Sequence, residues 1–414
     1  MLVRLLAILG QIVPYLASFL LGIVIITIII FNAFSPVSKT PNEPTMLFAV
    51  LEGDDLRKIA IRMEDSQLIR RWWALYYLAR MKGDTIETQL RKIPAGEYQI
   101  SSSMTPARIL ETLLSGNVIY YTFTIPEGAN IKEIAAIVEK STLATAAEIL
   151  KGATTSSTIQ NLGILSSSLE GYLFPDTYKF TKPITSEKIL QRLVDRTKAK
   201  LTPEVRKRAA DLNLSINQLL TLASIVEKET ADPKERPLIA SVFSNRLRLA
   251  MPLQSDPTVI YGIPDFNGNL TKLHLKTPNP YNTYLTKGLP PTPICNPGLE
   301  AIEAVLNPSE SEFLYFVAKN DSTHHFSTSY KEHREAVNRY QKERADVENE
   351  LAPKQQMNID ALLPPPPTKI EEAPKQKPKP KKITFGQLDF PTLGHDEANR
   401  ENVSQDKVNQ ILGQ

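Results

Sequence analysis

The apolar and polar positions divide the chain into a long uncharged segment, a series of short patterned elements and a polar tail. No charged residue occurs from Leu5 to Phe34. About 20 apolar residues span a bilayer as a helix, whereas a cleaved signal peptide is shorter and ends at small residues. We therefore expect residues 1–35 to form a retained transmembrane anchor, with a cleaved signal as the alternative. Arg4 favours a cytoplasmic N-terminus, which would place the rest of the protein outside the cytoplasmic membrane.

Two short segments after the anchor resemble each other. Residues 36–45 are polar and contain proline, which predicts a linker. Phe48–Ala60 and Phe123–Ala135 then carry Phe, a Glu-Gly pair and Ile-Ala in one register. Each pattern predicts a strand, a turn and a helix that opens after Asp or Asn. Units of this kind are the basis of LysM-like modules, so residues 46–140 are predicted to form a LysM-like α+β subdomain. It would either bind glycan or act as a spacer.

The rest of the pattern predicts an α+β protein. A strand after Ile93 and a helix from Pro106 to Leu114 fall inside the subdomain. Residues 141–346 are expected to form a mixed α/β domain, with one strand over Phe313–Ala318 and a final helix from about Tyr330. Residues 347–414 contain four consecutive prolines and a Lys/Pro run but no apolar periodicity. This composition predicts a disordered tail.

One predicted helix carries glutamates inside an apolar run. Residues 219–230 read LLTLASIVEKET, and Ser215 with Gln218 fits a capping box that starts the helix near Ile216. The helix is apolar nearly all round and should be internal. Glu227 and Glu229 lie on opposite faces near its C-terminal end.

These two glutamates are candidates for acid catalysis. Burial raises the pKa of a carboxyl, and the dipole at a helix C-terminus acts in the same direction. A carboxyl that is protonated near neutral pH can act as a general acid. Periodicity alone does not choose between Glu227 and Glu229.

The segments after this helix supply further polar candidates. Asp232 is predicted to cap the next helix, with Pro233 as the first helical residue and Glu235 as the third. Later loops are rich in proline, asparagine and tyrosine, which suits a sugar-binding groove. The candidates for positioning a sugar are Asn245, Gln254, Asp256, Asn282 and Tyr284. Each is about as well explained as a structural polar group, and Asp256 fits a turn cap before Pro257.

Composition narrows the chemistry. The net charge is only +3 with mixed signs, and we expect no nucleic-acid partner. Cys295 is the single cysteine, which excludes an intrachain disulfide and a cysteine-based metal cluster. The five histidines lack zinc-ligand spacing, and the chain has no Gly-rich phosphate loop or Gly-x-Ser-x-Gly elbow. We therefore expect no metal and no cofactor.

Several motifs in order carry a family resemblance. They are ASIVEKET, VFSNRL, LQSDPTVIYG, TPNPYNTY, KGLPP, FLYFVA and HHFSTS, preceded by EGYLFPDTY and the two Glu-Gly turns. Together they resemble the MltG (YceG-like) endolytic murein transglycosylases over residues 45–345. The loop PTPICNPG departs from the usual small-residue version, and the tail is not part of the usual pattern.

The resemblance implies a bacterial inner-membrane protein with a single anchor, a LysM-like subdomain and a YceG-like catalytic domain on the periplasmic side. The family cleaves the β-1,4 bond after N-acetylmuramic acid in nascent peptidoglycan strands and leaves 1,6-anhydro ends, which would end strand elongation. Cell-wall synthases are expected partners. Matching the motif places the catalytic acid on Glu229 and leaves Glu227 as a substrate-binding or structural residue. The alternatives are a water-using muramidase and a non-catalytic glycan-binding scaffold.

Overall fold

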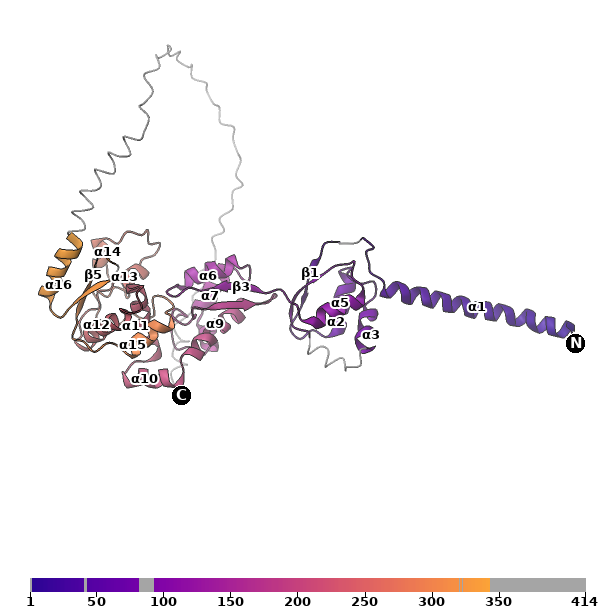
Figure 1. Cartoon of the computed structure of the whole chain (residues 1–414), viewed down its shortest axis with the longest axis horizontal. Helices are drawn as coiled ribbons and strands as arrows, with labels where there is room; N and C mark the ends of the chain where they lie inside the picture. The colour runs from indigo at the N-terminus through magenta and orange to yellow at the C-terminus, as the bar shows by residue number, and fades with distance from the viewer. Residues whose placement is uncertain (1, 41–42, 82–92, 320, 322, 343–414) are drawn as a thin grey trace, which may run out of the picture. The chain divides into compact units, whose positions relative to one another are not determined.

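The computed structural model describes residues 2–40, 43–81, 93–319, 321 and 323–342 (Figure 1). The predicted disordered tail lies outside these residues. Helix α1 (Leu2–Phe34) contains one stretch, Ile12–Phe34, that is long and apolar enough to cross a membrane. Nearly all of its side chains from Ile12 to Phe31 are exposed, as expected for a helix that meets lipid. The start of the predicted linker is held in place, because Arg70 donates hydrogen bonds to the carbonyls of Pro36 and Val37.

The first core belongs to a small α+β unit. Its elements are β1 (Met46–Val50), α2 (Leu56–Asp65), α3 (Trp72–Met81), β2 (Gly96–Ile100) and α5 (Pro106–Ser115). The strands β1 and β2 pair antiparallel with Phe48 opposite Tyr98, and both side chains join a core that runs to Val118. Asp55 caps α2, as the sequence predicted. Gly116 ends α5 with φ 69°, a left-handed conformation that favours glycine.

The second core starts with the second predicted unit. Its first elements are β3 (Tyr121–Thr124), α6 (Ile131–Lys140), α7 (Ala146–Thr154), α8 (Ser156–Asn161), β4 (Thr177–Phe180) and α9 (Ser186–Lys200). Asn130 caps α6 in a capping box, and β3 pairs with β4 rather than with the first unit. The two cores divide between Val118 and Phe123. The two similar units therefore contribute to different cores, because β3 finds its partner strand further along the chain.

The remaining elements follow α9 along the chain, and most of them contribute to the second core. They are α10 (Pro203–Asp211), α11 (Ile216–Glu229), α12 (Arg236–Arg248), α13 (Asp256–Tyr261), α14 (Lys272–Lys276), α15 (Leu299–Leu306), β5 (Tyr315–Ala318), β6 (His324–Ser327), α16 (Tyr330–Val337) and a π-helix (Asn338–Lys342). Every residue of α11 from Leu219 to Val226 is buried, which confirms an internal helix. It packs against α12, α13 and α15. The capping box of Ser215 and Gln218 is also confirmed.

Two further predictions meet different outcomes. The strand expected over Phe313–Ala318 is β5, which pairs antiparallel with β6. Helix α12 starts at Arg236, so the start expected at Pro233 is wrong. Asp232 accepts a hydrogen bond from the amide of Lys234, at 2.9 Å, and its carbonyl accepts one from the amide of Glu235. Asp232 therefore stabilises a turn before the helix, a common use of aspartate.

Candidate active site

Glu229 is the last residue of α11 and lines a cleft of about 400 Å³. Its Oε1 accepts a hydrogen bond from the Ser255 hydroxyl, at 2.5 Å. Burial raises the pKa of Glu229 to about 7; the charge of Asp256 adds to this effect, and the Ser255 hydrogen bond and the Arg246 charge oppose it. A substantial fraction of this carboxyl is therefore protonated at neutral pH, as a general acid requires.

The second oxygen of this carboxyl is not fully enclosed. Within the part of the chain that the structure describes, Glu229 Oε2 accepts no hydrogen bond. It is also absent from the buried polar atoms that lack a partner, so it keeps some exposure. Glu229 lines the cleft and also a hollow that it shares with Glu227, so Ser255 orients one oxygen and leaves the other free to give a proton to a bound molecule.

A rigid loop holds Ser255 beside the carboxyl. Ser255 is 2% exposed and donates its amide hydrogen to Thr283 Oγ1, at 3.0 Å. Its carbonyl accepts the Thr258 hydroxyl at 2.7 Å. The preceding Gln254 has φ 51° and donates its amide hydrogen to the Thr283 carbonyl. A left-handed glutamine is uncommon and persists only where its surroundings hold it. The loop therefore fixes the Ser255 hydroxyl rather than letting it rotate freely.

Arg246 joins three parts of the cleft wall. Its Nε donates to the Leu314 carbonyl at 2.6 Å, and its Nη1 donates to the Leu253 carbonyl at 2.7 Å. The guanidinium also lies 5.2 Å from the centre of the Tyr315 ring. These contacts tie α12 to β5 and to the loop of Ser255. The sequence analysis did not identify Arg246, because the sequence does not indicate which backbone carbonyls an arginine on a helix surface will bind.

Three of the predicted sugar-positioning residues lie in the same cleft as Glu229. They are Gln254, Asp256 and Tyr284. The Tyr284 hydroxyl donates to Asp256 Oδ1 at 2.6 Å, and Asp256 opens α13 with an exposed side chain. The structure brings these groups together around the acid, and their contact with a sugar stays a prediction.

Asn245 and Asn282 donate hydrogen bonds to the backbone. Asn282 is 0% exposed, and its amide group donates to the carbonyls of three residues, His274, Leu275 and Thr277. The amide group of Asn245 donates to the carbonyls of Ser311 and Phe313. These contacts favour a structural role, because the amide hydrogens already satisfy backbone carbonyls, and the contact of either residue with a sugar stays a prediction.

Glu227 does not line the cleft of Asp256 and Tyr284, but it shares another hollow with Glu229 and has different hydrogen-bond partners. Its Oε1 accepts Arg236 Nη2 at 3.0 Å, and its Oε2 accepts the Gly298 amide at 2.9 Å. Burial raises its pKa, while the Gly298 hydrogen bond and the Arg236 charge oppose that effect. Both oxygens are occupied and the side chain is only 5% exposed. These contacts favour the structural role that the sequence left open for Glu227.

Glu170 is a second buried acid that the sequence analysis missed. It is 1% exposed and accepts hydrogen bonds from the amide of Ile131, the Tyr261 hydroxyl and the Asn296 amide group. Burial raises its pKa to about 7, although these donors oppose the shift. Its segment EGYLFPDTY is rich in apolar residues, which is the same signal that pointed to Glu229. Glu170 connects the start of α6 to α13 and contributes nothing to the acid cleft.

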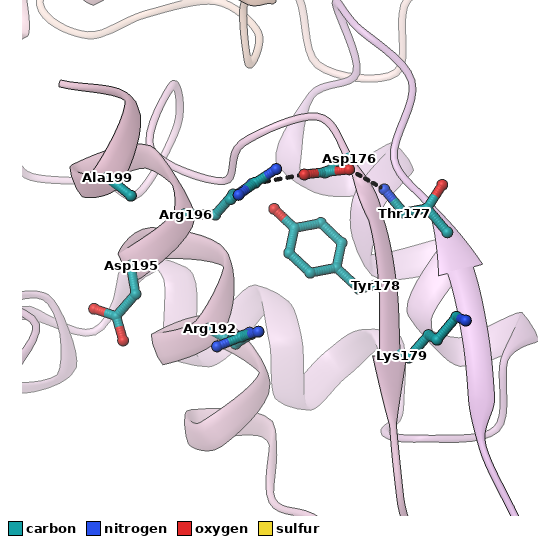
Figure 2. A pocket seen from close by; sticks show the side chains of 8 residues that line it. All are labelled: Asp176, Thr177, Tyr178, Lys179, Arg192, Asp195, Arg196 and Ala199. Atoms are coloured by element: carbon teal, nitrogen blue, oxygen red, sulfur yellow. Dashed lines mark hydrogen bonds and ion pairs between the residues drawn. The ribbon is translucent and has the colours of Figure 1, made fainter. Parts of the chain in front are cut away.

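A second hollow lies between β4 and α9 and has a volume of about 480 Å³ (Figure 2). Asp176 forms an ion pair there with Arg196, at 2.6 Å, as the dashed line in Figure 2 shows. Burial raises the pKa of Asp176, but its hydrogen bond from the Thr177 amide and the charge of Arg196 outweigh burial and lower it overall. Asp176 is therefore ionised at neutral pH, so this hollow offers no proton donor comparable to Glu229.

Comparison with known proteins shows the family of the chain. The model of the YceG-like family matches residues 48–339. The chain belongs to this family. The matched range contains both cores, the acid cleft and nearly all of the described residues after the anchor.

Relatives of this chain carry the name endolytic murein transglycosylase. The protein of Bacillus subtilis (strain 168) is 32% identical over 326 residues, which cover 75% of this chain and 88% of that protein. The protein of Streptococcus pneumoniae (strain D39) is 32% identical over 298 residues, with 64% of this chain covered. This chain spans about half of the streptococcal protein, 53%. A crystal structure of a YceG-like protein from Listeria monocytogenes is 30% identical and covers 70% of this chain and 98% of that one, with a TM-score of 0.49.

Proposed function

We propose that this protein is a peptidoglycan lytic transglycosylase that cleaves glycan strands internally. The observation that carries the proposal is Glu229, which lines a cleft and whose pKa is raised to about 7. The names of the relatives, endolytic murein transglycosylase, support the same activity. The substrate would be the MurNAc–GlcNAc β-1,4 bond of nascent strands, and cleavage would end strand elongation.

Glu229 would act twice in one turnover. Its carboxyl first gives a proton to the glycosidic oxygen as the bond from that oxygen to muramyl C1 breaks. The resulting carboxylate then removes the proton from the muramyl C6 hydroxyl, and this oxygen forms a bond to C1. Atoms and charges balance: the donated proton stays on the hydroxyl of the leaving GlcNAc, the proton of the C6 hydroxyl restores the acid form of Glu229, and the other product has a 1,6-anhydro end. A pKa near 7 suits a group that must both donate and accept a proton.

A water-using muramidase is the second candidate, and Asp256 is the observation that favours it. Glycosidases that use water need a second carboxylate, and Asp256 lines the same cleft as Glu229. Its Oδ1 accepts the Tyr284 hydroxyl, so the carboxylate is held in position. We prefer the transglycosylase because Glu229 alone suffices for that reaction.

Product analysis separates these functions. Sacculi digested with the full-length protein are analysed by mass spectrometry. Anhydro ends support the transglycosylase, and reducing ends that disappear in Asp256→Asn support the muramidase. If the wild-type protein releases neither product but still binds glycan, it acts as a non-catalytic scaffold.

We further propose that α1 anchors the protein in the bacterial inner membrane with the catalytic domain outside the cytoplasm, beside cell-wall synthases. The exposed apolar side chains of α1 and the position of Arg4 support this orientation. Residues 46–140, which include the small unit of β1, β2, α2, α3 and α5, would be the LysM-like subdomain, and residues 141–346 would be the catalytic domain. Protease added to spheroplasts tests the orientation: it should digest the catalytic domain, and protection of that domain would contradict the proposal.

A further inference from the structure

His324 opens β6 and lies on the wall of the cleft that contains Glu229. Glu235, at the start of α12, contacts His324 with both of its carboxyl oxygens. Oε1 accepts the His324 amide at 2.8 Å, and Oε2 lies 2.6 Å from Nδ1. Both side chains are 11% exposed.

The Glu235 contacts determine which ring nitrogen remains available. A carboxylate accepts hydrogen bonds, so the proton of the neutral imidazole is on Nδ1, and Nε2 carries a lone pair. The ring cannot easily turn, because Phe316 packs edge-on at 5.5 Å and Phe326 lies at 6.4 Å. The orientation of His324 is thus fixed from two sides, by a carboxylate and by aromatic rings.

Nε2 has no partner in the described part of the chain. It is also absent from the buried polar atoms that lack a hydrogen bond. This nitrogen is therefore accessible, and the accessible space beside His324 is the acid cleft. Two other polar groups of the cleft are already engaged: Tyr284 donates to Asp256, and Arg246 donates to backbone carbonyls.

We propose that His324 is a substrate-binding residue whose Nε2 accepts a hydrogen bond from a hydroxyl or acetamido N–H of the glycan bound beside Glu229. Glu235 is a positioning residue that fixes the tautomer and orientation of the ring. The proposal rests on the function proposed above for its choice of ligand, an amino-sugar strand. It adds a contact on the wall of the cleft that β6 forms. This strand comes later in the sequence than Gln254, Asp256 and Tyr284, the other predicted sugar contacts of the cleft.

Two substitutions separate the two nitrogens. In His324→Asn the side-chain amide reaches the place of Nδ1 and keeps the Glu235 contact, but nothing replaces Nε2. In His324→Gln the amide reaches the place of Nε2 and loses the Glu235 contact. His325→Asn is the matched control, because side chains alternate along a strand and the His325 ring lies against Tyr340, at 5.8 Å.

Binding is measured with full-length protein in detergent and isolated strands of alternating GlcNAc and MurNAc, in the Glu229→Gln background to prevent cleavage. We expect His324→Asn to weaken binding several-fold, up to about tenfold, which is the range for one hydrogen bond. His324→Gln should bind more tightly than His324→Asn despite a lower melting temperature, and His325→Asn should bind as the parent does.

The opposite ranking would overturn the proposal. If His324→Asn binds as tightly as the parent while His324→Gln loses both binding and stability, His324 only fastens β6 to α12. Because this assay reads binding without turnover, it stays informative if the wild type makes no anhydro product. The two proposals can therefore fail separately. In the active protein, the His324→Asn defect should appear in KM rather than in kcat, as expected for uniform binding.

Discussion

Removing the Ser255 hydroxyl should change the pH range in which the protein works. This hydroxyl donates to Glu229 Oε1 at 2.5 Å and stabilises the ionised carboxylate. Burial raises the pKa of Glu229 to about 7 in spite of this bond. In Ser255→Ala the carboxylate loses a donor and the protonated acid is favoured further, so the pKa must rise.

The magnitude follows from the strength of one hydrogen bond to a charged group. Such a bond contributes about 1.5–3 kcal/mol, and a change of one pH unit corresponds to about 1.4 kcal/mol. Glu229 retains some exposure to the cleft, so we take the lower end of the range. The alkaline limb of the activity profile should then move upward by about one pH unit.

The assay is the pH dependence of kcat/KM for release of anhydro ends, which reports the pKa of the acid in the free enzyme. Ser311→Ala is the control, because the Ser311 hydroxyl pairs with Ser241 instead of Glu229. Its profile should match that of the wild type. An alkaline limb that stays in place or moves downward in Ser255→Ala would refute the assignment of this limb to Glu229.

Three other substitutions separate structural polar groups from the acid. Glu227→Gln should lower the free energy of unfolding by about 2–3 kcal/mol, because an amide cannot accept from both Arg236 and Gly298, yet still yield anhydro ends; loss of these products with folding intact would make Glu227 the acid. Asn282→Ala should cost a similar amount, about 2–3 kcal/mol, by removing the hydrogen bonds that its amide group donates to three carbonyls, with an unchanged KM as the check. The pKa of Glu170 is raised from 4.5 to about 7 on folding, so its contribution to stability is present below pH 4.5 and is lost as the pH rises to about 7. Melting curves should show wild-type protein losing up to about 3 kcal/mol relative to Glu170→Gln over this range, and parallel curves would contradict the buried-acid interpretation.

Local patterns predicted the elements well where caps and periodicity coincide. The start of α11 at Ile216, the cap of α6 at Asn130 and the end of α5 at Gly116 all depend on residues within one turn of each other. The start of α12 was wrong because Asp232 fits a turn as well as a helix cap, and only the surrounding structure decides between them. The pairing of β3 with β4 could not be predicted from local patterns, because the paired residues are 53 to 59 positions apart along the chain.

The candidate site could also be predicted only in part from local sequence patterns. Apolar context around Glu227 and Glu229 identified two buried acids on different faces, but not their partners. Ser255 and Arg246 meet Glu229 or its cleft through long-range packing that no local pattern records. An asparagine in a polar loop can bind either backbone carbonyls or a substrate, and the sequence of the loop does not distinguish the two roles. The backbone contacts of Asn282 were therefore visible only in the structure.

The most direct test of the central claim compares wild-type protein with Glu229→Gln on the same glycan strands. Products are separated and their ends identified by mass spectrometry, with folding checked by thermal unfolding. We predict 1,6-anhydro ends from the wild type and none from Glu229→Gln, which removes the proton donor but keeps a side chain of the same size. Anhydro ends from a folded Glu229→Gln protein at the wild-type rate would contradict the account.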